Sequence, residues 1–273
     1  MRSITIVASL VIVIPLLAQE VAKPVKPPVP RTADGKPDMS GIWQGGGAGG
    51  LAFAIGSDNA KAARPGDAAV AVAPAAPQVS RARPPYQDWM LPKLKEIRDR
   101  RNIDDPSARC LLVGVPRITN MPLPIKIIQT PGEITFLYET FHAFRVIPTD
   151  GRKHPDDIDP SFMGDSVAHW EGDTLVVESV GFEPVPRGIN FPYSEKMKIV
   201  ERFKLADPET LSVDTRIVDP LALTQPYSMG NRIFKRHRGW TIAEYECEEN
   251  NRNYVDESGK AGIRLANPTA SPK

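Results

Sequence analysis

Apolar and polar residues alternate along most of the second half of the chain, which is the two-residue period of a β-strand. A short apolar stretch at 39–43 comes earlier and is a candidate opening strand. We expect the remaining strands at residues 125–130, 134–140, 143–148, 166–171, 174–180, 197–205, 211–218, 231–235 and 240–247. Turn residues separate these runs, and Glu171-Gly172-Asp173 predicts a hairpin between two of them. Short strands at this spacing predict an all-β, mainly antiparallel fold, best fitted by a closed up-and-down barrel.

The first half of the chain has a different pattern. Residues 86–101 carry apolar side chains at Trp89, Leu94 and Ile97, which predicts one helix with Pro92 near its first turn. Residues 19–38 are rich in Pro and Lys and indicate an extended tether, whereas residues 45–85 are rich in Gly, Ala and Pro and indicate a long flexible insertion. We therefore predict a barrel domain over 39–260 and a flexible tail over 261–273.

The beginning of the chain predicts export. Met1 and Arg2 precede an apolar run over 4–17, and Ala18 offers a small residue for cleavage, so residues 1–18 are interpreted as a signal peptide. A buried N-terminal strand is the alternative interpretation. The run is too short for a stable transmembrane anchor, so we expect no membrane span after cleavage and a periplasmic or secreted protein.

Export changes the expectation for the two cysteines, Cys110 and Cys247, because disulfides persist outside the cytoplasm. A bridge between them would close a long loop and stabilise the fold by about 4–5 kcal/mol on the chain-entropy argument. We predict this disulfide over the alternative of two free buried thiols.

Charge and motifs exclude several function classes. Basic and acidic residues number 34 and 33, and the basic ones are scattered, so nucleic acid is not an expected partner. The glycine-rich run at 45–50 lacks the strand, helix and lysine of a phosphate-binding loop. We therefore expect no nucleotide and no other cofactor.

Two clusters could carry acid/base chemistry. Strand alternation and a tight turn place Tyr138, Glu139, His142 and Arg145 near one hairpin end, where an imidazole beside a carboxylate and a guanidinium suits proton transfer or anion binding. The alternative is an ordinary hydrogen-bonded turn with an ion pair.

The second cluster follows Gly164 and contains Asp165, Ser166 and His169, with Glu178 on the partner strand. A serine hydrolase is disfavoured, because Ser166 lacks the strand-to-helix turn of a nucleophile elbow. His169 is interpreted as an acid/base or as a polar anchor in a pocket, against a purely structural histidine.

Further candidates stand alone. Glu201 shares a strand face with apolar neighbours, which would raise its pKa if it were buried without a partner, and Tyr245 lies between two glutamates. The loop with His154 and Asp156, Asp157 and Asp159 has carboxylates for a hard cation but no EF-hand spacing, so we expect a solvated loop and no metal. Trp43, Trp170 and Trp240 are expected in the core.

Long stretches of the chain resemble a family of exported bacterial proteins that is abundant in soil bacteria and mostly classed as hypothetical. The most specific stretch is GDSVAHWEGDTLVVESVGF at 164–182. The resemblance implies no activity. Gly41-Ile42-Trp43 resembles the Gly-x-Trp opening of lipocalin-type barrels, which implies a calycin-like barrel with the tryptophan closing one end.

We expect the barrel interior or mouth to hold a small, partly apolar molecule. The protein would be a cofactor-free acid/base enzyme, namely a lyase, isomerase or hydrolase. The alternatives are a protein that only binds the ligand, and an exported interaction module. In the enzyme the catalytic groups would be His142, His169, Glu139, Glu178 and Glu201. The substrate would be bound by Tyr138, Arg145, Asp165 and Tyr245, with Tyr138 or Arg145 stabilising an oxyanion.

Overall fold

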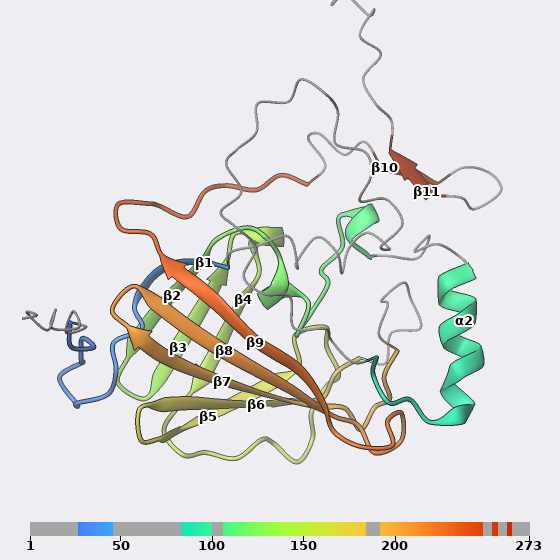
Figure 1. Ribbon diagram of the computed structural model, residues 1–273, viewed down its shortest axis with the longest axis horizontal. Coiled ribbons are helices and arrows are strands. Elements are labelled where there is room, and N and C mark those ends of the chain that lie inside the picture. Colours follow the sequence, from blue (N-terminus) through green and yellow to red (C-terminus); the bar gives the residue numbers. More distant parts are fainter. Residues whose placement is uncertain are drawn as a thin grey trace, which may run out of the picture.

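The computed structural model describes residues 27–45, 83–99, 106–183, 192–247, 253–255 and 261–263 (Figure 1). The predicted signal peptide, residues 19–26 of the predicted tether, residues 46–82 of the predicted insertion and the tail after 263 lie outside the described residues. Within the described residues, no helix combines the length and apolar character needed to cross a membrane.

Nine antiparallel strands form one sheet that curls into a nearly closed barrel (Figure 1). The strands are β1 (Gly41–Gly45), β2 (Ile125–Thr130), β3 (Glu133–Tyr138), β4 (Phe144–Pro148), β5 (Asp165–Glu171), β6 (Thr174–Val180), β7 (Lys198–Asp207), β8 (Thr210–Val218) and β9 (Tyr227–Arg236). Their order is β4-β3-β2-β1-β9-β8-β7-β6-β5, so β1 pairs with both β2 and β9. The all-β, up-and-down barrel predicted from the alternating pattern is confirmed.

The barrel has one seam, between β4 and β5. Neighbouring strands alternate in direction along every ladder of the sheet, and an odd number of strands in a ring forces one neighbouring pair to point the same way. The registers assign that role to β4 and β5, which both end at the end of the barrel that holds the β2–β3 and β5–β6 turns. The connection over 149–164 therefore returns along the whole length of the barrel, as Figure 1 shows beneath β5.

Side chains fill the barrel interior. Inward positions of the strands alternate with outward ones, and large residues such as Trp43, Phe136, Phe203 and Phe234 are at most 2% exposed. The Trp43 indole donates to the carbonyl of Met39 at 2.8 Å, which fixes the ring at its end of the barrel. Packed side chains thus occupy the interior, which together with the barrel mouth was where we expected a ligand.

Helical structure is limited in the described residues. The predicted helix is shorter than expected: α2 spans Leu91–Asp99, with Pro92 in its first turn and with Leu94 and Ile97 buried. Trp89 precedes it and is exposed, because its indole reaches the carbonyl of Leu221 instead of the core. Single 3-10 turns lie at η2 (Asp88–Met90), η3 (Pro106–Arg109), η4 (Ile118–Asn120) and η5 (Thr140–His142). A separate two-stranded sheet joins β10 (Asn253–Val255) to β11 (Ala261–Ile263).

Residues 27–38, predicted as part of the tether, lie against the barrel. Arg31 donates to both carboxylate oxygens of Asp173 at 2.9 and 2.8 Å, in the turn between β5 and β6. The ammonium of Lys36 lies 5.8 Å from the centre of the Trp170 ring. This part of the chain therefore lies against the end of the barrel that contains the β5–β6 turn.

The prediction of a last strand over residues 240–247 is wrong. Residues 237–247, which we call the strap, leave β9 and run extended along the outside of the barrel without a strand partner (Figure 1). The strap follows the β-period, but β9 already pairs with β1 and β8, so the sheet has no free edge at that point. The predicted disulfide between Cys110 and Cys247 is confirmed and anchors the end of the strap.

Candidate functional site

A buried ion pair lies inside the barrel. Arg145 of β4 donates from Nη1 to Oε2 of Glu201 on β7 at 2.6 Å, and both side chains are at most 2% exposed. Arg145 Nη2 donates to Ser166 Oγ of β5 at 3.1 Å and to Ser179 Oγ of β6 at 2.8 Å. Because β4 and β5 flank the seam, one guanidinium connects both sides of the seam from within.

Two further hydroxyls complete this group, which we call the interior polar cluster. Thr119 donates to Glu201 Oε1 at 3.3 Å, and Arg145 Nη1 also contacts the Tyr138 hydroxyl at 3.4 Å. Burial is the largest single influence on the pKa of Arg145 and would lower it, but the attraction and hydrogen bonds from Glu201 and Tyr138 together outweigh burial and raise that pKa. Burial also raises the pKa of Tyr138. The raised pKa values keep the Arg145 guanidinium charged and the Tyr138 hydroxyl protonated near neutral pH, which suits structural cohesion better than proton transfer.

The predicted hairpin-end cluster is divided between two environments. Tyr138 and Arg145 point into the barrel, whereas Glu139 and His142 face the strap outside it. Glu139 Oε2 accepts the Ala243 amide at 2.9 Å, and His142 Nε2 accepts the Tyr245 amide at 3.0 Å. The four side chains therefore do not form one acid/base site.

The second predicted cluster is also separated. Ser166 belongs to the interior polar cluster, while the His169 side chain is 61% exposed and contacts Glu171 at 3.2 Å on the outer face. Hydrogen bonds from Arg202, and then from His169, lower the pKa of Glu171. His169 thus belongs to an exposed group of ion pairs with Glu171 and Arg202, whereas His142 contacts the strap.

Asp165 and Glu178 do come together, through a histidine that we considered only as a metal ligand. His154, from the 149–164 connection, contacts Asp165 Oδ1 with Nδ1 at 2.5 Å and lies 3.8 Å from Glu178 Oε1 with Nε2. Lys198 neutralises Glu178 at 3.0 Å. These contacts hold the connection against β5 and β6. Within the described residues, no three metal-ligating side chains form a site.

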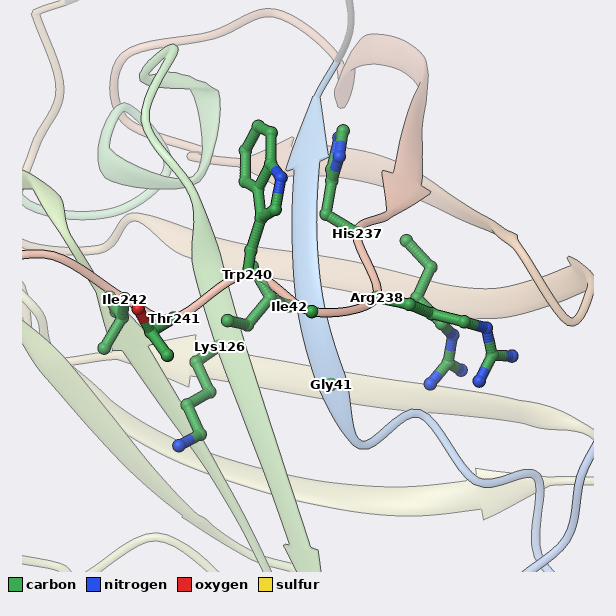
Figure 2. A pocket seen from close by; sticks show the side chains of 10 residues that line it. Gly41, Ile42, Lys126, His237, Arg238, Trp240, Thr241 and Ile242 are labelled. Atoms are coloured by element: carbon green, nitrogen blue, oxygen red, sulfur yellow. The ribbon is translucent and has the colours of Figure 1, made fainter.

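A hollow of about 640 Å³ lies on the outer surface, between the strap and strands β1 and β2 (Figure 2). Ile42 points outward, since its neighbour Trp43 points inward, yet Ile42 is only 7% exposed because the strap covers it. The lining residues are Gly41, Ile42, Lys126, Arg236, His237, Arg238, Gly239, Trp240, Thr241 and Ile242.

The walls of the hollow combine an aromatic pair with apolar residues. The rings of His237 and Trp240 stack with centroids 3.8 Å apart and planes within 20°, and Trp240 is 47% exposed. Ile42 and Ile242 supply aliphatic surface. Figure 2 shows the two rings side by side, with Lys126 and Arg238 on opposite sides of β1. A ligand with a planar apolar body has matching surface here.

Positive charge surrounds this surface. Lys126, Arg236 and Arg238 line the hollow, and none of its lining residues is acidic. Arg236 donates to backbone carbonyls, including those of Pro208 at 2.8 Å and Asp38 at 3.2 Å. Burial, and then the charge of Arg238, lower the pKa of Arg236. Arg238 is partly neutralised by Glu209, to which its Nε donates at 3.0 Å. The net field therefore favours an anion.

Sequence reasoning missed this hollow, because it assigned Trp240 to the core and its segment to a strand. One local signal was available: a basic run, Arg236-His237-Arg238, stands immediately before Gly239-Trp240. Lys126 lies far away in sequence, on β2, and carried no signal of its own.

The chain matches no known family model, no curated protein and no solved structure.

Proposed function

We propose that this is an exported protein that binds a small organic anion with an aromatic or otherwise planar body, in the surface hollow beside the strap. The observation that carries the proposal is the composition of the hollow: a stacked His237–Trp240 pair, aliphatic walls, one lysine, two arginines and no acidic lining residue. Small-molecule sites commonly join apolar surface to a few fixed polar groups in this way. The Cys110–Cys247 disulfide is compatible with an oxidising compartment.

Binding is supported better than catalysis. An acid/base enzyme needs its proton donor, proton acceptor and substrate within hydrogen-bond reach. His142 contacts the strap, His169 contacts an exposed Glu171, and Glu201 is buried against Arg145. These groups have separate partners, and the described residues of the hollow include no carboxylate that could act as a base.

The test uses one ring system in two charge states. We expect the full-length protein to bind 2-naphthoate about tenfold more tightly than its neutral amide, which corresponds to about 1.4 kcal/mol, in a calorimetric titration. Raising the salt concentration should weaken binding of the carboxylate and leave the amide unchanged, since salt screens the charge attraction.

Matched variants locate the site. Trp240→Ala should weaken 2-naphthoate binding about tenfold by removing the stacking surface, and Lys126→Gln about threefold by removing one exposed charge. Trp89→Ala and Lys153→Gln are the controls, because both residues are exposed and neither lines the hollow. Equal affinity for the carboxylate and the amide, or equal effects of Trp240→Ala and Trp89→Ala, would contradict the proposal.

A further inference from the structure

The strap is fixed to the barrel at alternate residues. The amides of Ala243 and Tyr245 donate to Glu139 and His142, and Cys247 is bonded to Cys110 two residues later. Alternate residues of an extended chain present their amides to the same side. Glu139 and His142 therefore take the place of the carbonyls that a neighbouring strand would supply.

Backbone strain is concentrated at these attachment points. Among the described residues, three other than glycine have positive φ angles: Cys110 at 56°, Phe141 at 59° and His142 at 51°. Left-handed conformations are unfavourable for residues with a Cβ and persist only where the surroundings impose them. Phe141 also packs edge-on against Tyr245, with ring centroids 5.8 Å apart. The strained turn thus contacts the strap directly.

The same strap forms a wall of the hollow. Its first residue donates from the His237 amide to the Ile42 carbonyl at 2.8 Å, and Trp240, Thr241 and Ile242 then line the hollow. Between that first bond and the Ala243 amide, the described residues show no other backbone hydrogen bond from the strap to the barrel. The position of this wall therefore depends on its two attached ends.

We propose that Glu139 and His142 are positioning residues for the ligand site: their hydrogen bonds to Ala243 and Tyr245 hold Trp240, Thr241 and Ile242 in the arrangement that accepts the anion. This inference rests on the proposed function. It gives both residues a role without placing either in contact with the ligand. His142 must present an unprotonated Nε2, because a protonated nitrogen donates a hydrogen bond and cannot accept one from an amide.

The variants are chosen so that the effect of losing a hydrogen-bond acceptor for the strap can be told apart from the effect of losing a negative charge. Glu139→Ala removes the acceptor and also a negative charge, and loss of that charge alone would strengthen anion binding. Glu139→Gln removes the charge but keeps a carbonyl acceptor. His142→Gly removes the imidazole at a backbone position that glycine adopts without strain, so the turn itself is not penalised.

Two measurements are made on each full-length variant. Amide hydrogen exchange reports whether the strap is held and needs no ligand, and calorimetry with 2-naphthoate reports whether the site is in place. We expect Glu139→Ala and His142→Gly to speed exchange at Ala243 and Tyr245, respectively, by about tenfold. Each should weaken 2-naphthoate binding about fivefold, whereas Glu139→Gln should restore both properties to within about twofold of wild type.

The outcomes distinguish the two proposals. Faster exchange with unchanged affinity overturns the positioning role and leaves the proposed function intact. Unchanged exchange in both Glu139→Ala and His142→Gly also overturns it, because the strap is then held by other contacts. A wild type that binds neither naphthalene probe overturns the proposed function, and the positioning role with it. The exchange rates still show whether Glu139 and His142 hold the strap in place.

Discussion

Arginines occupy two contrasting regions of this protein. Arg145, inside the barrel, is almost fully buried and meets the carboxylate of Glu201 and the hydroxyls of Ser166 and Ser179. Arg236, at the surface hollow, meets backbone carbonyls and has no carboxylate among the lining residues. The first charge is neutralised within the fold by a buried carboxylate, whereas the second donates to backbone carbonyls and is one of the charges that we propose attract an anion.

The contrast teaches that the degree of burial decides whether an arginine needs a carboxylate partner. A buried guanidinium without a counter-charge would be strongly destabilising, so its partners must be supplied by the protein. A half-buried guanidinium at the surface remains solvated on one side and tolerates the absence of a carboxylate. Burial and pairing therefore distinguish the structural arginine, Arg145, from Arg236, which we propose takes part in anion binding.

The largest expected effect comes from breaking the interior pair. Glu201→Gln leaves the Arg145 charge buried without its carboxylate and should reduce the free energy of unfolding by about 3–5 kcal/mol, measured by urea denaturation. Glu171→Gln is the control, because it removes a partner from the exposed Glu171–Arg202 pair and should cost less than about 1 kcal/mol. Similar losses in the two variants would refute the contrast between the regions.

A smaller effect is expected at the seam. Ser179→Ala removes one of the two hydroxyls that accept from Arg145 Nη2 and should cost about 1–3 kcal/mol in the same denaturation experiment. The matched control is Ser228→Ala on β9, whose side chain is exposed at the surface. If Ser179→Ala cost no more than this control, the hydroxyls would have no part in holding the seam together.

The smallest effect concerns an exposed pair and gives a pH dependence. Hydrogen bonds from Arg152 lower the pKa of Asp150 from its ordinary value of 3.8 to about 2. Because the folded-state pKa is depressed, the stabilisation is present above pH 3.8 and is lost as the pH falls through about 2. In Arg152→Gln the Asp150 carboxyl should titrate near its ordinary value by carbon NMR, with little change in unfolding near neutral pH. An unchanged titration would show that Arg152 is not the cause.

Much of the fold followed from local pattern. The alternating runs predicted β2 to β9 with ends within a few residues, except that β9 begins four residues before the predicted start. The expected export of the chain predicted the Cys110–Cys247 disulfide, and the alternation of apolar and polar residues placed Glu201 on an inward, apolar strand face. The strand predictions succeeded because strand period and inward direction depend on neighbouring residues.

The candidate site could be predicted only in fragments. Alternation did not show that the turn at 140–142 would separate Glu139 and His142 from Tyr138 and Arg145, because the left-handed φ angles at Phe141 and His142 redirect the chain. It also did not show that 240–247 would lack a strand partner, since that depends on β1 already pairing with β9.

The sequence by itself determined the all-β class, the succession of strands, the inward and outward faces of each, and which cysteines were available to pair. Only the tertiary structure decided which two neighbouring strands of the nine-stranded barrel are parallel. It also decided which arginine is buried with a carboxylate, and how the strap forms one wall of a hollow lined by basic residues. The physical reason is range. Strand pattern arises from adjacent residues, whereas a buried charge pair or a pocket wall joins residues more than fifty positions apart.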